Sequence, residues 1–259
     1  MHFSHANGFP APSYRKFFAG LERDFEIGWI ERIGHDPRYP VTDGWPHLVD
    51  ELIEHVASTY REPVVAAGHS LGGFLTLRAA ARRPDLFRAI VVMDSPIPKR
   101  WSGTALQMVK RIGLVDRVTP AGATRERRSD WSSVEEAVEH FRGKRNFRGF
   151  DPECLRDYVT LGMRREGERV RLAFDPEVEY RIYRTIPHDL VDDLPALAVP
   201  AGFVCGEESS EMRRPGLVDL RRHFRVVRVP GGHLFPFERP AEAAAAVRAL
   251  ARGLAPPSA

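Results

Sequence analysis

The segment Pro63-Val64-Val65-Ala66-Ala67-Gly68-His69-Ser70-Leu71-Gly72-Gly73 decides the fold. Its first five residues form an uninterrupted run of apolar residues, which is typical of a strand buried on both faces of a sheet. A helical pattern follows as far as Arg83, and Pro84 ends it. Ser70 therefore stands at a sharp strand-to-helix turn. The glycines two residues before and two after it allow the close backbone approach that such a turn needs.

Strand-like and helix-like patterns alternate on both sides of this segment. Strands are predicted over 1–4, 25–30, 89–93, 201–205 and 224–229, and helices from about Asp43 to 56 and over 241–250. This alternation predicts an α/β fold with a mostly parallel sheet and helices on both faces. Residues 96–187 instead read as several helices separated by Gly and Pro, with no clear strand. We expect a core of residues 1–95 and 188–259, a helical insertion at 96–187, and a disordered end at 255–259.

Composition and charge narrow the classes of function. Hydrophobic residues make up 43% and charged residues 28% of the 259 residues, as in ordinary soluble domains. The net charge of +3 does not imply nucleic-acid binding. The positive excess lies in the insertion, which has 19 basic and 14 acidic residues. Cys154 and Cys205 show neither metal-ligand nor disulfide spacing. We therefore expect no metal or other cofactor, a cytoplasmic location and no membrane span, and the sequence leaves the oligomeric state open.

Ser70 is the candidate nucleophile, and a serine hydroxyl needs a base within hydrogen-bond reach. His233 is the best candidate base. It follows two glycines directly after the last predicted strand, where the chain turns over the carboxyl end of the sheet. The pattern indicates attack of the serine on a carbonyl carbon.

Acyl transfer also needs hydrogen-bond donors for the developing oxyanion. The backbone N–H of Leu71 is one candidate because it begins the helix after Ser70. The loop at residues 5–10, which follows the first strand, is best placed to supply the second. The N–H of Phe9 is the first choice there and that of Asn7 the second.

Together these features resemble the α/β-hydrolase superfamily over nearly the whole chain. The turn at residues 68–73 and the Gly-Gly-His at 231–233 lie in the order of that superfamily, serine before histidine. Asn7-Gly8-Phe9-Pro10 looks like the His-Gly-Phe-Pro oxyanion loop of its esterases, with Asn7 in place of the histidine. The resemblance implies that residues 96–187 form a helical cap over the active site, which shapes substrate choice.

The acid that orients the histidine has two possible positions. In most of the family an aspartate stands three residues after the position of Gly206, but this chain has Ser209 there, with Glu207 and Glu208 just before it. A subgroup of small esterases carries its aspartate at the end of the strand after the nucleophile helix, with Gly-x-x-Ser in the later slot. This chain resembles that subgroup in both places, so Asp94 is favoured over Glu208.

The resemblance implies a serine hydrolase of the carboxylesterase type, acting on a small ester, thioester or lactone through an acyl-enzyme. Hydrolysis of a carbon–carbon bond, perhydrolysis, and a small-molecule receptor built on the same fold remain alternatives. Four aromatic residues of the insertion are candidates for lining an acyl pocket, although packing within the insertion is the more common role for such residues. They are Trp101, Trp131, Phe141 and Phe147.

Overall fold

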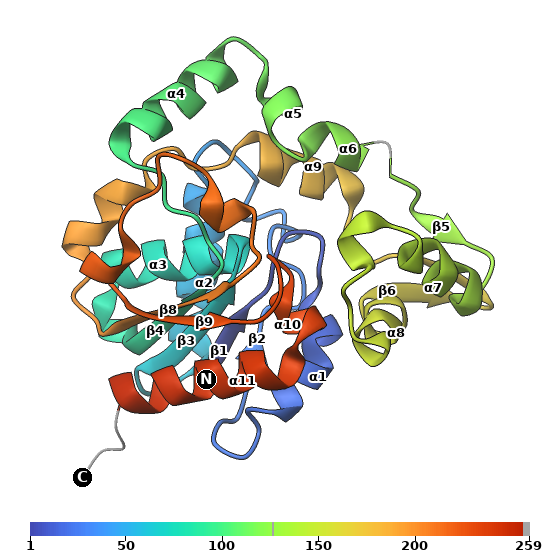
Figure 1. Cartoon of the computed structure of the whole chain (residues 1–259), viewed down its shortest axis with the longest axis horizontal. Coiled ribbons are helices and arrows are strands. Elements are labelled where there is room, and N and C mark those ends of the chain that lie inside the picture. Colours follow the sequence, from blue (N-terminus) through green and yellow to red (C-terminus); the bar gives the residue numbers. More distant parts are fainter. Residues whose placement is uncertain (126, 256–259) are drawn as a thin grey trace.

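A six-stranded sheet forms the centre of the fold in the computed structural model, which describes residues 1–125 and 127–255 (Figure 1). Its strand order is β2-β1-β3-β4-β8-β9, and all five neighbouring pairs are parallel. The strands are β1 (His2–Ser4), β2 (Gly28–Trp29), β3 (Val64–His69), β4 (Phe87–Met93), β8 (Ala201–Gly206) and β9 (Arg225–Val229). The predicted α/β fold with a mostly parallel sheet is confirmed. The predicted disordered residues 256–259 lie outside the described residues.

Helices cover both faces of this sheet. Helices α2 and α3 pack on one face and α1 and α11 on the other, with the short α10 before α11. These helices are α1 (Arg15–Ala19), α2 (Pro46–Thr59), α3 (Leu71–Arg82), α10 (Phe235–Glu238) and α11 (Pro240–Leu254). Strand β3 is buried along its whole length and β4 at all positions but one. This burial on two sides explains their continuous apolar sequences.

The segment 96–187 leaves the core after β4 and returns before β8. It holds the helices α4 (Arg100–Arg111), α5 (Val115–Val118), α6 (Ala121–Arg125), α7 (Val134–Arg142), α8 (Pro152–Thr160) and α9 (Pro176–Arg184). It also holds an antiparallel sheet of order β5-β7-β6, formed by β5 (Asp130–Trp131), β6 (Met163–Glu166) and β7 (Arg169–Leu172). The prediction that this segment has no strand was therefore wrong. Its strands are short and mostly charged, with a single buried residue in each, so they give no apolar run.

Several predicted boundaries also differ, among them those of α2 and β2. Helix α2 begins at Pro46 rather than near Asp43, because Trp45 has a left-handed backbone with φ of 61° and interrupts the helix there. The Asp43 carboxylate, which could have capped a helix that began there, pairs with Lys110. Strand β2 is limited to two paired residues of the predicted stretch 25–30.

Within the described residues, no helix is both long and apolar enough to cross a membrane.

Candidate active site

Ser70 lies between β3 and α3 with φ of 52° and ψ of −113°, a backbone conformation that L-residues rarely adopt. A Cβ on Gly68 would lie 2.2 Å from the carbonyl oxygen of Gly72, so the strand and the helix approach too closely for any other residue. Hydrogen bonds fix the turn on both sides. Ser70 N–H donates to the Met93 carbonyl (2.8 Å), and Ser95 Oγ donates to the Ser70 carbonyl (2.8 Å).

The structure brings Ser70, His233 and Asp94 together at the carboxyl edge of the sheet. His233 Nε2 lies 3.0 Å from Ser70 Oγ, and His233 Nδ1 lies 2.8 Å from Asp94 Oδ1. Because a carboxylate only accepts hydrogen bonds, Nδ1 carries the proton and Nε2 is free to accept the serine proton. The side chain of Asp94 is fully buried, whereas that of His233 is 27% exposed.

Three hydrogen bonds hold the Asp94 carboxylate. Besides His233, Oδ1 accepts from Ser209 Oγ (2.6 Å), and Oδ2 accepts from the Gly206 N–H (2.8 Å). Ser209, which stands three residues after Gly206, thus donates to the candidate acid Asp94. Sequence reasoning singled out Ser209 but did not foresee this contact. Glu208, the alternative acid, is exposed.

The predicted oxyanion donors differ in their present partners. Leu71 N–H lies at the first position of α3, where no carbonyl within the helix is available to it. Phe9 N–H donates to the Ala6 carbonyl (3.1 Å) and so closes a turn in which Gly8 has φ of 80°. The Ala6 carbonyl has a second partner, His5 Nδ1 at 2.9 Å.

Comparison with known proteins agrees with this architecture. The model of the alpha/beta hydrolase family matches residues 3–247. The chain belongs to this family. It is 27% identical over 197 residues to lipase LipV of Mycobacterium tuberculosis, covering 72% of this chain and 67% of that protein.

Two solved structures share the α/β-hydrolase fold. E-2-(acetamidomethylene)succinate hydrolase superposes with a TM-score of 0.76 at 20% identity, over 96% of this chain and 90% of that chain. An esterase of M. tuberculosis gives a TM-score of 0.70 at 21% identity, over 96% of this chain and 83% of that chain.

A buried hydrogen-bonded chain connects the loop of residues 5–10 to His233 in this hydrolase. Ala6 N–H donates to Tyr14 Oη (3.1 Å), which lies 2.7 Å from His69 Nδ1. His69 Nε2 donates to the carbonyl of His233 (2.9 Å). Since that carbonyl only accepts, Nε2 carries the proton of a neutral ring, and Tyr14 must donate to Nδ1. Burial lowers the pKa of His69 to about 3, which keeps the ring neutral.

The inserted segment contacts the same loop. Asn7 Nδ2 donates to the backbone carbonyl of Glu179 in α9 (3.0 Å). The buried Glu179 carboxylate pairs with Arg127 Nη1 (2.6 Å), and Arg127 Nη2 donates to Tyr158 Oη (3.0 Å). The Phe9 ring packs against Tyr158, with ring centroids 5.2 Å apart. Asn7, which replaces the usual histidine, thus ties the loop to α9.

The other predicted pocket residues have different positions. Trp131, Phe141 and Phe147 are buried in a core that the insertion shares with α1 and α11, whereas Trp101 is 64% exposed. The described residues contain no cluster of three or more His, Cys, Asp or Glu side chains arranged to hold a metal ion.

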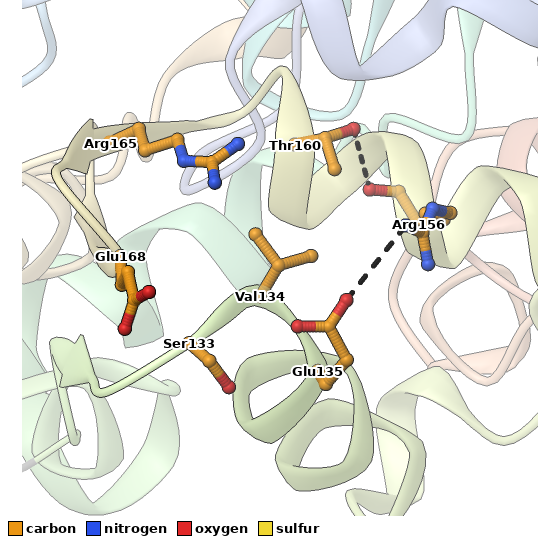
Figure 2. A pocket seen from close by; sticks show the side chains of 7 residues that line it. All are labelled: Ser133, Val134, Glu135, Arg156, Thr160, Arg165 and Glu168. Atoms are coloured by element: carbon orange, nitrogen blue, oxygen red, sulfur yellow. Dashed lines mark hydrogen bonds and ion pairs between the residues drawn. The ribbon is translucent and has the colours of Figure 1, made fainter.

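A hollow of about 350 Å³ lies within the insertion, between α7, α8 and the β6–β7 turn (Figure 2). Its lining residues all belong to positions 133–168 and include two arginines and two glutamates. Of these, Arg156 and Glu135 pair across it at 4.0 Å. None of the elements that line it carries Ser70, Asp94 or His233.

Proposed function

We propose that this α/β-hydrolase is a serine esterase that cleaves a small carboxylic ester, thioester or lactone through an acyl-enzyme. The hydrogen-bonded chain from Ser70 Oγ through His233 to Asp94, with distances of 3.0 and 2.8 Å, carries the proposal. These distances are within the range for general-base catalysis.

In the acylation step, Ser70 Oγ attacks the substrate carbonyl while His233 Nε2 removes the hydroxyl proton. Asp94 stabilises the imidazolium that forms. When the tetrahedral intermediate collapses, His233 returns the proton to the leaving alcohol or thiol. A water molecule then enters and loses a proton to the same nitrogen, and its hydroxide adds to the acyl carbon. Collapse of the second tetrahedral intermediate releases the acid and restores the Ser70 hydroxyl.

Leu71 N–H and Phe9 N–H are the proposed oxyanion donors. Phe9 must exchange its present acceptor, the Ala6 carbonyl, for the oxyanion. Two features favour this exchange. A hydrogen bond to an anion is stronger than one to a neutral carbonyl, and the Ala6 carbonyl keeps the hydrogen bond from His5 Nδ1.

Residues 96–187 are proposed to act as a cap that shapes the acyl site, on a core of residues 1–95 and 188–259. The support is the contact between the insertion and the oxyanion loop: Asn7 bonds to α9, and Phe9 packs on aromatic rings of the insertion. Substrate preference is therefore expected to depend on the insertion.

The test is turnover of p-nitrophenyl esters of increasing acyl length by the wild-type protein and by Ser70→Ala. We expect repeated turnover, with kcat lowered by about 10⁵ to 10⁶ in the variant. Activity that Ser70→Ala retains would refute the assignment of the nucleophile. A single stoichiometric burst without turnover would favour a receptor over an esterase.

A further inference from the structure

Helices α4 and α5 form the outer edge of the insertion, at a distance from the central sheet (Figure 1). Of the seven large apolar side chains that are exposed among the described residues, five lie on this pair of helices or beside it. Their exposed fractions are 64% for Trp101, 54% for Met108, 59% for Ile112, 38% for Leu114 and 54% for Val118. We call residues 99–118 the arm.

Three apolar side chains of the arm share one face. Trp101, Met108 and Ile112 are spaced by seven and four residues, which places them on one side of a helix. The other side of α4 is fixed to the body of the protein. A Cβ on Gly103 would lie 1.9 Å from the His188 carbonyl, and Lys110 Nζ donates to the Ile186 carbonyl. The contacts of α4 therefore hold its apolar face toward solvent.

The charges of the arm and the residues that follow it are mostly positive. Residues 99–125 contain six basic residues and one acidic residue, Asp116, which pairs with Arg184. Arg100 and Lys110 pair with Asp192 and Asp43 of neighbouring segments. Lys99, Arg111 and Arg117 are exposed, and none of them forms an ion pair within the part of the chain that the structure describes. The arm thus combines exposed apolar side chains with unneutralised positive charge.

We propose that the arm binds the surface of an anionic lipid bilayer. The apolar side chains enter the boundary between head groups and acyl chains, and the basic side chains contact the anionic head groups. A protein partner would have to offer a groove to receive the separate side chains that project from a single outer helix. A fluid bilayer surface accommodates them without a preformed groove.

This binding has a consequence for the site if the proposed esterase function holds. The arm begins five residues after Asp94, and its base is attached to the loop after β8 by the hydrogen bond from Lys99 N–H to the Gly216 carbonyl (2.7 Å). Both attachment points belong to the carboxyl edge of the sheet. Docking of the arm therefore brings that edge near the bilayer, where apolar esters accumulate.

The experiment uses the full chain with vesicles of phosphatidylcholine alone or mixed with phosphatidylglycerol. Binding is measured by co-sedimentation and by tryptophan fluorescence in a Trp29→Phe background. In that background Trp101 is the exposed tryptophan, because Trp45 and Trp131 are buried. We expect binding to the anionic vesicles, with a blue shift of the emission and quenching by brominated lipid.

Three variants separate the contributions. M108E/I112E is expected to abolish binding, and R111Q/R117Q to weaken it by about 25-fold at low salt. Leu161→Glu is the matched control, because Leu161 is an apolar residue exposed to 42% on another element, and should bind like the wild type. All three should retain full turnover of a water-soluble ester, which separates this proposal from the proposed function.

Equal binding to both kinds of vesicle, or binding that survives M108E/I112E, would overturn the proposal. A concentration-dependent dimer that disappears in M108E/I112E, without vesicle binding by the wild type, would show instead that a second copy of the chain covers the arm.

Discussion

The substitution Asp94→Asn tests whether the buried Asp94 carboxylate determines which ring nitrogen of His233 carries the proton. The Gly206 N–H is a rigid backbone donor at 2.8 Å from Oδ2, so the new amide must turn its oxygen toward it. The amide NH₂ then occupies the position of Oδ1 and faces His233 and Ser209. The Ser209 hydroxyl can rotate to accept a hydrogen bond. His233 can accept one only if Nδ1 loses its proton to Nε2.

A proton on Nε2 prevents His233 from accepting the proton of Ser70. We therefore expect Asp94→Asn to lower kcat by up to about 10⁴ with little change in the fold, the size of effect known for a wrong histidine tautomer in a serine-protease triad. The assay is steady-state turnover of a p-nitrophenyl ester, combined with ¹⁵N NMR of the His233 ring to identify the protonated nitrogen.

Glu208→Gln is the matched control, because it makes the same chemical change at an exposed carboxylate near the same loop. Its kcat should stay within about twofold of the wild type. A kcat above one-tenth of wild type in Asp94→Asn, or a comparable loss in Glu208→Gln, would show that Asp94 is not the residue that orients His233.

Three further predictions concern the groups around the site. Burial lowers the pKa of His69 to about 3 and of His5 to about 4, so the folded state resists protonation. The contribution of each of these two histidines to stability should be constant above the unfolded pKa of about 6.5. It should fall below that pH by about 1.4 kcal/mol per pH unit, until the pH approaches the folded pKa. Burial raises the pKa of Glu51 to about 7, so this one group opposes the two histidines; a urea midpoint that is unchanged from pH 7 to 5 would contradict the prediction. Tyr14→Phe leaves His69 Nδ1 and the Ala6 N–H without their hydrogen-bond partner. The free energy of unfolding should therefore fall by about 1–3 kcal/mol. A urea midpoint equal to that of the wild type would argue against a stabilising role for the hydrogen bonds of Tyr14. Glu179→Gln leaves Arg127 buried without its counter-ion and should lower the free energy of unfolding by about 3–5 kcal/mol. The double variant Arg127→Met/Glu179→Gln should lose less stability than the sum of the two single variants. Additive losses in this double-mutant cycle would show that the pair is not coupled.

Local sequence patterns predicted those parts of the molecule that depend on neighbouring residues. The glycines around Ser70 indicated a tight strand-to-helix turn, because only a close backbone approach requires them. The position of Asp94 at the end of a buried strand placed its side chain at the carboxyl edge, where the structure shows it beside His233.

Contacts between distant segments could not be predicted in the same way. The hydrogen bond from Asn7 to the Glu179 carbonyl spans 172 residues, and the hydrogen bond from Ser209 to Asp94 spans 115. Neither leaves a periodic pattern in the sequence. The exposure of Trp101 was also unforeseen, since an amphipathic helix is usually assumed to turn its apolar face inward.

Mass spectrometry of the protein after reaction with a fluorophosphonate identifies the nucleophile. We expect one adduct per chain, on the peptide that contains Ser70, formed much more slowly in His233→Ala and absent in Ser70→Ala. An adduct on another residue, or labelling of Ser70 at an unchanged rate in His233→Ala, would contradict the proposed nucleophile and base.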